Sequence, residues 1–86
     1  MREDEIVKYP LSTEKAIRLM ESENKLVFVV DRRADKKEVK KAIETLFKTK
    51  VTKVNMFVSP KGVKKAYIKF SSETPAIDIA TQLGMI

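Results

Sequence analysis

The chain has 86 residues, of which 43% are hydrophobic and 35% are charged, and its formal net charge is +6. This length and composition predict one small domain over residues 1–86, exclude a chain too polar to collapse, and leave little interior for a deep catalytic pocket. Neither cysteine nor histidine occurs in the sequence, which excludes disulfides, thiolate chemistry and the commonest acid–base and metal-binding side chain.

The first third of the chain predicts a strand, a helix and a second strand. A short strand over residues 6–9 stops at Pro10, because a proline ring cannot donate to the ladder. Ser12 is a candidate N-cap for a helix over residues 13–22. The inward residues of this helix are Ala16, Ile17 and Met20. Residues 25–31 are apolar throughout 26–30, so we expect this strand to lie inside a sheet with both faces covered.

The next element is the helix with the clearest sequence signals. Asp35 and Glu38 predict a capping box, after which the helix runs to about residue 48. Its apolar residues recur at the spacing of a core-facing stripe: Val39, Ala42, Ile43, Leu46 and Phe47. Its outer face carries Lys36, Lys37, Lys40, Lys41, Glu44 and Lys48. Lysines on such a face serve either solubility or contact with an anionic ligand.

Residues 51–70 predict two strands joined by the loop Pro60-Lys61-Gly62, with Gly62 in the left-handed position that ends a three-residue loop. On the apolar face this register pairs Met56 with Ala66 and Val54 with Ile68. The opposite face carries the pairs Lys53 with Lys69, Asn55 with Tyr67 and Phe57 with Lys65. Lysines alternating with aromatic residues suit a ligand that bears phosphates and stacks, although a solvated face that discourages aggregation has the same pattern.

The end of the chain predicts a short last helix. Thr74-Pro75 is a typical start and Gly84 a typical end. Its inward residues are Ala76, Ile77, Ala80 and Leu83. The element order is therefore β-α-β-α-β-β-α, which predicts a small α+β fold with helices packed on one sheet.

The positive charge is concentrated in one part of the chain. Residues 36–69 hold eleven lysines against two glutamates, a balance of +9, whereas residues 1–35 have a balance of −1 and residues 70–86 of −2. This distribution favours a polyanionic partner, and nucleic acid is favoured over a membrane because no helix combines lysines with a broad apolar face. No apolar run has the length of a membrane span, and acids at positions 3–5 argue against a secretory signal.

The sequence offers no catalytic constellation. The hydroxyls of Ser12, Thr13 and Ser59 have no histidine to activate them. The acids at positions 3–5 lie on a terminus that we expect to fray, and the remaining carboxylates show no metal-ligand spacing. Lys61-Gly62 lacks the frame of a phosphate-binding loop. We therefore expect no enzyme activity, no cofactor and no metal site.

Several segments, in their order and spacing, resemble the signature blocks of the family of the twenty-third protein of the large ribosomal subunit. They are residues 10–16, 24–31, 34–40, 46–47, 51–55 and 64–68. Residues 80–86 resemble the archaeal end of that family. The short loop at residues 60–62 departs from the long hairpin extension of bacterial members, which favours an archaeal type.

This resemblance implies an antiparallel four-stranded sheet in the order 1-2-4-3. It implies a structural constituent of the large subunit in the cytoplasm, bound to large-subunit ribosomal RNA beside the exit tunnel. The twenty-ninth large-subunit protein would be its neighbour. In bacterial members the chaperone trigger factor docks at an acid that corresponds to Glu14 here. Archaea lack that chaperone, so the signal recognition particle and the protein-conducting channel are the expected visitors.

Phosphate neutralisation by lysines and stacking by aromatic side chains form the expected mechanism of RNA binding. The residues predicted to contact RNA are Lys15, Lys36, Lys40, Lys53, Asn55, Lys61, Lys64, Lys65, Tyr67 and Lys69. Two other classes stay open from the residues alone. One is a free-standing module that binds single-stranded RNA by stacking, and the other is an adaptor that binds a protein through the last helix or a sheet edge.

Overall fold

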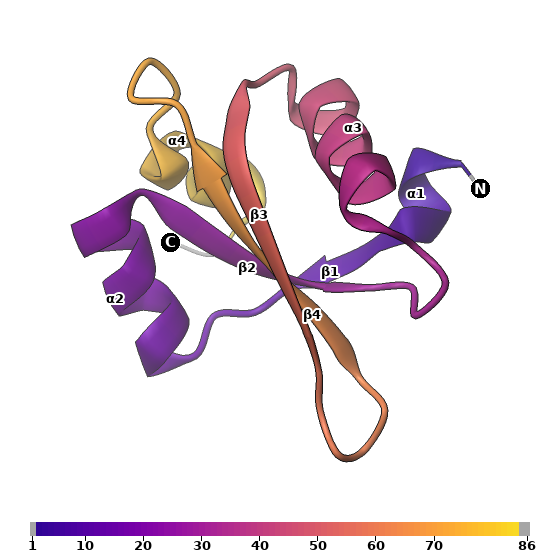
Figure 1. Cartoon of the computed structure of the whole chain (residues 1–86). Helices are drawn as coiled ribbons and strands as arrows, with labels where there is room; N and C mark the ends of the chain where they lie inside the picture. The colour runs from indigo at the N-terminus through magenta and orange to yellow at the C-terminus, as the bar shows by residue number, and fades with distance from the viewer. Residues whose placement is uncertain (1, 85–86) are drawn as a thin grey trace.

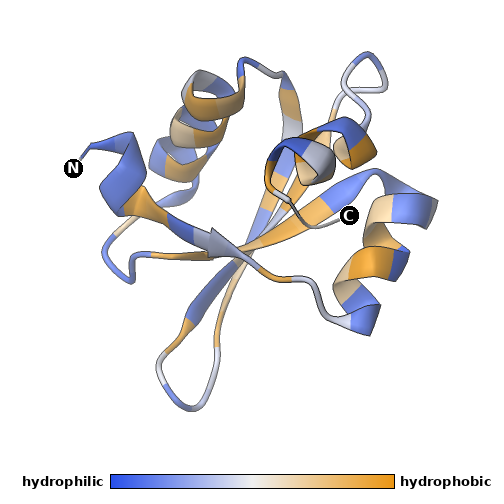
Figure 2. Cartoon of the chain, turned by 180° about the vertical axis from the view of Figure 1, so that it is seen from behind, coloured by the Kyte–Doolittle hydropathy of each residue, from blue (hydrophilic) through white to orange (hydrophobic). Residues whose placement is uncertain are grey.

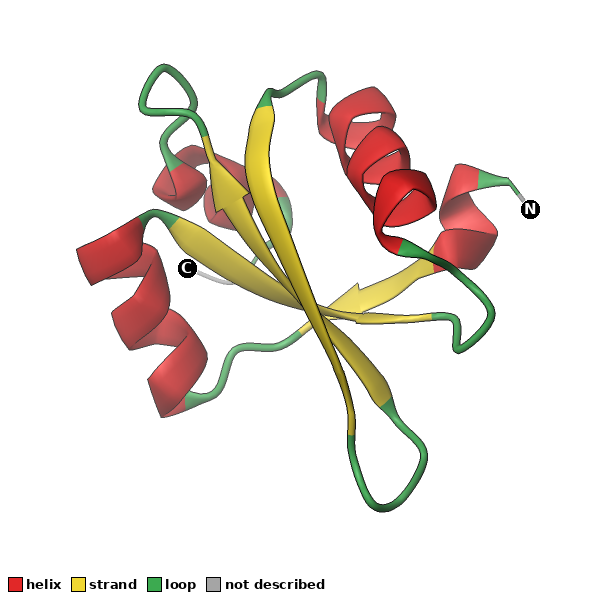
Figure 3. Cartoon of the chain, in the orientation of Figure 1, coloured by secondary structure: helices red, strands yellow, loops and turns green. Residues whose placement is uncertain are grey.

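The structure of the protein, a computed structural model, describes residues 2–84. Four antiparallel strands form one sheet in the order β1-β2-β4-β3; they are β1 (Val7–Pro10), β2 (Lys25–Val30), β3 (Val51–Val58) and β4 (Lys64–Phe70). The helices are α1 (Glu3–Ile6), α2 (Glu14–Glu23), α3 (Lys36–Phe47) and α4 (Ala76–Gln82). Figure 1 shows the order of the elements, and Figure 3 shows the strongly twisted strands with helices on both sides. The predicted α+β fold and strand order are confirmed.

Two predictions concern the C-terminal segment and membrane spans. The last two residues of segment 80–86, which suggested an archaeal type, lie outside the described residues. Within residues 2–84, no helix has both the length and the apolar character needed to cross a membrane.

The core lies on one face of the sheet. Leu26, Phe28 and Val30 of β2 are each 1% exposed, and they pack with Ile68 of β4 and Ile43 of α3. Alternate residues of β2, such as Val27 and Val29, are also buried although they point to the other face. The predicted interior position of this strand is therefore confirmed. In Figure 2 hydrophobic and hydrophilic residues alternate along the helices, as expected for helices that bury one side.

The hairpin has the predicted register. Met56 lies opposite Ala66 and Val54 opposite Ile68 on the core face, while the pairs led by Lys53, Asn55 and Phe57 lie on the other face. The Ser59 N–H donates to the Val63 carbonyl at 2.8 Å, and the Gly62 N–H donates to the Ser59 carbonyl at 2.8 Å. Gly62 has a φ of 83°, which confirms the predicted left-handed position. The closed loop projects beyond the helices at the bottom of Figure 1.

Each edge strand contains one irregularity that changes which face its residues occupy. In β3, Val51 pairs with Phe70 and Lys53 with Lys69, so that Thr52 is an extra residue in the ladder. In β1, Val7 pairs with Val30 but Tyr9 pairs with Val29, so that Lys8 is the extra residue. Such bulges turn the following side chain to the opposite face. Val51 and Val7 consequently face the core, while Lys53 and Tyr9 face away from it.

The helix starts confirm one predicted cap and correct another. The Asp35 carboxylate accepts from the Glu38 N–H at 2.8 Å and the Glu38 carboxylate accepts from the Asp35 N–H at 3.2 Å, so the capping box is present. Ser12, however, is not the cap of the preceding helix. Because α2 begins one residue later than predicted, the Thr13 hydroxyl occupies the cap position and accepts from the Ala16 N–H at 3.2 Å.

The prediction of a frayed N-terminus was wrong. Residues 3–6 form α1 instead of a frayed end, whereas the predicted strand over residues 6–9 is present with bounds one residue later, from Val7 to Pro10. The physical reason is burial: Ile6 is only 5% exposed, and α1 packs against α3. Figure 1 shows the two helices side by side.

Two residues predicted to face inward are exposed. Leu46 is 42% exposed, whereas Phe47, the last residue of α3, packs against the core. Successive residues of a helix point about 100° apart, so Leu46 faces away when Phe47 faces inward. Ile77 is 50% exposed, whereas Ile79 is 1% exposed. The buried face of α4 is therefore formed by Ala76, Ile79 and Ala80, which is the i, i+3, i+4 pattern shifted from the predicted one.

Asn24 holds three parts of the chain together. It ends α2 with a left-handed φ of 56°, and its side-chain oxygen accepts from the Ala76 N–H at 2.6 Å at the start of α4. Its amide nitrogen lies 3.2 Å from the carbonyl oxygens of Phe70 and Ser71 and 3.3 Å from that of Thr74. The N-terminus of α4, which has no cap within its own segment, is thus satisfied by a distant residue.

Candidate nucleic-acid interface

The sheet face opposite the core, called the open face below, is centred on Tyr67 of β4. The Phe57 ring meets the Tyr67 ring edge-on, with centroids 5.4 Å apart and planes at 87°. The Lys15 ammonium of α2 lies 6.0 Å from the Tyr67 ring centroid. Phe57 is 61% exposed, so its ring offers a surface on which a base can stack. The structure therefore brings the predicted residues Lys15 and Tyr67 together, although they are far apart in sequence.

A row of lysines crosses the open face beside this aromatic pair. Lys25 of β2, Lys69 of β4 and Lys53 of β3 occupy neighbouring positions on three strands. Lys25 is paired with Glu23 at 3.1 Å, but no carboxylate among residues 2–84 pairs with Lys53 or Lys69. The row therefore presents uncompensated positive charge, which is what a phosphate backbone requires.

Two further rows complete the face. Asn55 lies opposite Tyr67, and Lys65 lies opposite Phe57. A hollow of about 150 Å³ between α2 and the sheet has Lys15, Lys65 and Tyr67 in its wall. Amide, ammonium and phenol groups thus converge within one region, where they can donate hydrogen bonds to phosphates, riboses and base edges.

The other predicted contact residues lie away from the aromatic pair. Lys61 is exposed in the hairpin loop, at the end of the open face. Lys36 and Lys40 are exposed on α3, which packs on the core face of the sheet. The predicted residues therefore form at least two separate cationic surfaces rather than one.

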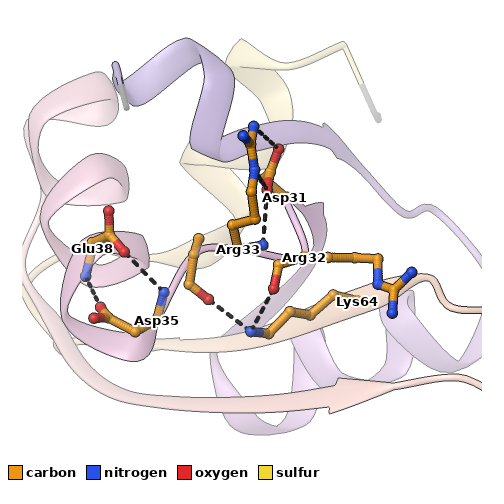
Figure 4. A network of polar contacts seen from close by, with 7 residues as sticks. Asp31, Arg32, Arg33, Asp35, Glu38 and Lys64 are labelled. Atoms are coloured by element: carbon orange, nitrogen blue, oxygen red, sulfur yellow. Dashed lines mark hydrogen bonds and ion pairs between the residues drawn. The ribbon is translucent and has the colours of Figure 1, made fainter.

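Lys64 differs from its neighbour Lys65, because it lies on the core side of β4. Its ammonium donates to the Ala34 carbonyl at 2.7 Å and to the Arg32 carbonyl at 3.3 Å, as Figure 4 shows. These bonds fix the segment between β2 and α3. Contact of Lys64 with RNA stays a prediction, but its charge already has partners within the fold.

The same segment contains a local ion pair. Arg33 Nε donates to Asp31 Oδ1 at 3.1 Å, and the Arg33 N–H donates to the same oxygen at 2.8 Å (Figure 4). These hydrogen bonds lower the pKa of the Asp31 carboxyl to about 2, and the side-chain bond from Arg33 has the larger effect. The pair neutralises one arginine of this loop and leaves the Arg32 guanidinium outside any ion pair among the described residues.

Glu14, the predicted docking residue, lies at the exposed start of α2. Its carboxylate pairs with Arg18 at 2.7 Å, one helical turn away. A side-chain exposure of 82% leaves the carboxylate accessible to a partner. Glu14 lies in the first turn of α2, and its docking role stays a prediction.

Sequence reasoning missed Tyr9, which is 53% exposed on the open face opposite Val29. The spacing of Val7 and Tyr9 places both on the same face of a regular strand, and only the bulge at Lys8 turns Tyr9 to the open face, so the sequence contained no local signal for this residue.

A small α+β protein with its core on one face of its sheet, and with unpaired lysines around exposed aromatic side chains on the other, has features typical of proteins that bind nucleic acid. The sequence model of the family described as Ribosomal protein L23 matches residues 5–77. The chain therefore belongs to the ribosomal protein L23 family, as the sequence blocks predicted.

A curated relative supports the same assignment. The chain is 47% identical over 81 residues to a protein of Trypanosoma brucei brucei named "Large ribosomal subunit protein uL23". The alignment covers 94% of this chain and 49% of the relative, so the chain spans about half the length of that protein. Membership of the family also confirms the predicted localisation on the ribosome in the cytoplasm. The archaeal type stays a prediction.

Proposed function

We propose that this chain is a structural constituent of the large ribosomal subunit and binds large-subunit ribosomal RNA as one RNA-binding unit. The observation that carries the proposal is the open face, where Lys53, Lys65 and Lys69 surround Tyr67 and Asn55 without acidic partners. The relative's name, which assigns that protein to the large subunit, supports the same role. Such a role is architectural and requires no catalytic group.

The mechanism follows from the two kinds of side chain on the face. Lysine ammonium groups neutralise phosphates and release counterions, which makes affinity fall steeply with salt. Phe57 and Tyr67 supply rings for an unpaired base, and Asn55 supplies an amide for ribose or base edges. We assign the lysines of α3, Lys36 and Lys40, and the loop lysine Lys61 to secondary contacts, because they lie away from the aromatic pair.

We further propose that the chain lies beside the nascent-chain exit tunnel, with the twenty-ninth large-subunit protein as its neighbour. In this arrangement Glu14 is a docking point for the signal recognition particle or the protein-conducting channel. The sequence resemblance and the exposure of the carboxylate at the start of α2 support this proposal.

The test is a comparison of two triple variants that remove the same charge from different surfaces. One is Lys53→Ala with Lys65→Ala and Lys69→Ala on the open face, and the other is Lys36→Ala with Lys40→Ala and Lys41→Ala on α3. Binding of each to large-subunit ribosomal RNA fragments, and to an unstructured RNA of matched length, is measured across a salt series.

We expect the open-face variant to lose affinity for a folded fragment and to flatten the dependence of log affinity on log salt. The slope should fall by about 2 to 3, since each lost phosphate contact contributes roughly 0.7 to 0.9. The α3 variant should lose less. Equal losses would mean that net charge alone matters, and an unchanged open-face variant would exclude this face. Equal binding of the wild type to both RNAs would indicate the single-strand module instead.

A further inference from the structure

A second hollow on the open face lies between β1 and the hairpin loop. Its apolar wall is formed by Tyr9, Leu11, Val29, Pro60 and Val63, and its polar rim includes Lys61 and Lys65. The volume of about 450 Å³ falls within the range of roughly 300 to 1,000 Å³ that is usual for small-ligand sites. An apolar wall of this kind does not suit a phosphate or a ribose, but it suits a planar base.

The geometry of β1 directs an aromatic ring into this hollow. Tyr9 would share the core-facing side of Val7 in a regular strand, but the extra residue Lys8 turns it to the open face. There it is 53% exposed, opposite Val29. A large ring left half in water at the wall of an apolar hollow gains more from a stacking partner than from solvent.

Cationic side chains line both hollows that Tyr9 borders. A neighbouring hollow of about 190 Å³ shares Tyr9, Val29 and Val63 with the first and is lined in addition by Lys8 and Arg32. The Arg32 guanidinium packs against the hairpin loop, since a Cβ placed on Gly62 would lie 3.3 Å from its Nη1. No acid lines either hollow.

The charges around the two hollows favour a nucleotide over an apolar peptide side chain as the ligand. Among residues 2–84, Lys8, Arg32, Lys61 and Lys65 have no ion-pair partner. An apolar peptide side chain would fill the hollow but leave these four charges unused. A nucleotide within an RNA strand uses both features, because its base is apolar and planar and a phosphate lies on each side of it.

We propose that the hollow receives one unstacked base of RNA against the Tyr9 ring. The two flanking phosphates lie near Lys61 and Lys65 on one side and near Lys8 and Arg32 on the other. This inference rests on the proposed function and adds to it a base-binding subsite, separate from the aromatic pair Phe57 and Tyr67.

The test uses Tyr9→Leu, which removes the ring, and Tyr9→Phe, which keeps it. Both are titrated with a large-subunit ribosomal RNA fragment that the wild type binds, across a salt series, next to the control Lys53→Ala with Lys69→Ala. Because Tyr9 is half exposed, both variants should fold, and circular dichroism and the unfolding midpoint verify this.

We expect Tyr9→Leu to bind roughly 5- to 100-fold more weakly, as expected for the loss of one stacked base. Tyr9→Phe should bind like the wild type. The slope of log affinity against log salt should not change for either, because stacking releases no counterions, whereas the lysine control should flatten it.

Three outcomes would overturn the proposal. If Tyr9→Leu keeps wild-type affinity while the lysine control loses it, the hollow binds no base and the proposed RNA-binding function stands. If Tyr9→Phe loses as much as Tyr9→Leu, the phenol hydroxyl is used and stacking is not. If neither Tyr9→Leu nor the lysine control changes affinity, both the subsite and the proposed RNA-binding face fail.

Discussion

Asn24 is the single residue whose substitution tests the packing of the fold most directly. In Asn24→Ala the Ala76 N–H, on a residue that is 0% exposed, loses its acceptor, at a cost of about 1 to 3 kcal/mol. The amide can donate two hydrogen bonds to the three surrounding carbonyls, each worth about 0.5 to 1.5 kcal/mol net. Alanine in the left-handed conformation costs roughly 1 kcal/mol more.

These contributions are not fully additive, because one side chain makes all of them. We therefore expect Asn24→Ala to lower the free energy of unfolding by about 3 to 5 kcal/mol. Asn24→Gly adopts the left-handed conformation without strain and should lose about 1 kcal/mol less. The measurement is urea unfolding followed by far-ultraviolet circular dichroism, with the slope m checked for constancy.

Lys48 provides the matched control, because it is the other described non-glycine residue with a positive φ, at 51°, and it is exposed. Lys48→Gly relieves the same backbone strain but removes no tertiary hydrogen bond from a side chain. It should leave the free energy of unfolding unchanged or raise it by up to about 1 kcal/mol. A loss below about 1 kcal/mol in Asn24→Gly would refute the view that this side chain holds α4 to the end of β4.

Three other perturbations separate stability from binding. Phe47→Ala should lower the free energy of unfolding in urea by about 2 kcal/mol, below the roughly 3 to 5 kcal/mol of a fully buried ring. The reason is that Phe47 is only partly buried where its ring stacks on Phe28, with ring centroids 5.9 Å apart. A loss above about 4 kcal/mol would contradict this packing. Asp31 has a pKa lowered from 3.8 to about 2, so its stabilisation is present above pH 4 and lost as the pH falls toward 2; Asp31→Asn should remove that part of the acid sensitivity in a pH series, and an unchanged profile would exclude it. Lys64→Met should lower stability by about 1 to 2 kcal/mol without flattening the salt dependence of RNA binding, and a flatter slope would place Lys64 at the interface.

The parts of the fold that could be predicted from the sequence depend on residues close together in the chain. The hairpin register follows from a three-residue loop and from the strict alternation of Lys53 to Phe57 and of Lys65 to Lys69, because a slip by one residue would bury lysines. The capping box of α3 lies within four residues, from Asp35 to Glu38. Both predictions were correct because no distant segment was needed to decide them.

The parts that could not be predicted depend on contacts between distant segments. The four residues of α1 have no stable helix of their own, and their conformation depends on packing against α3. The contact of Lys15 with Tyr67 and the bonds of Lys64 to the loop after β2 join residues 30 or more positions apart. Sequence alone placed these lysines on a list of RNA contacts but not on a common surface.

The bulges in the edge strands explain how the open face acquires its charge. Val51 and Val54 are both buried although they are three residues apart, a spacing that a regular strand cannot place on one face. The extra residue Thr52 resolves this conflict, and its hydroxyl donates to the Lys69 carbonyl at 3.2 Å. As a result Lys53 lies directly opposite Lys69.

Like charges directly opposite each other on neighbouring strands destabilise a sheet. Lys53 and Lys69 nevertheless share one row with Lys25, and within the described residues only Lys25 has an acidic partner. The repulsion is relieved when an anion lies over the row, so a bound phosphate both gains from the lysines and removes a cost of the free fold. The lysine row therefore destabilises the free protein and stabilises a complex with RNA. This difference favours the RNA-bound state and agrees with the proposed function.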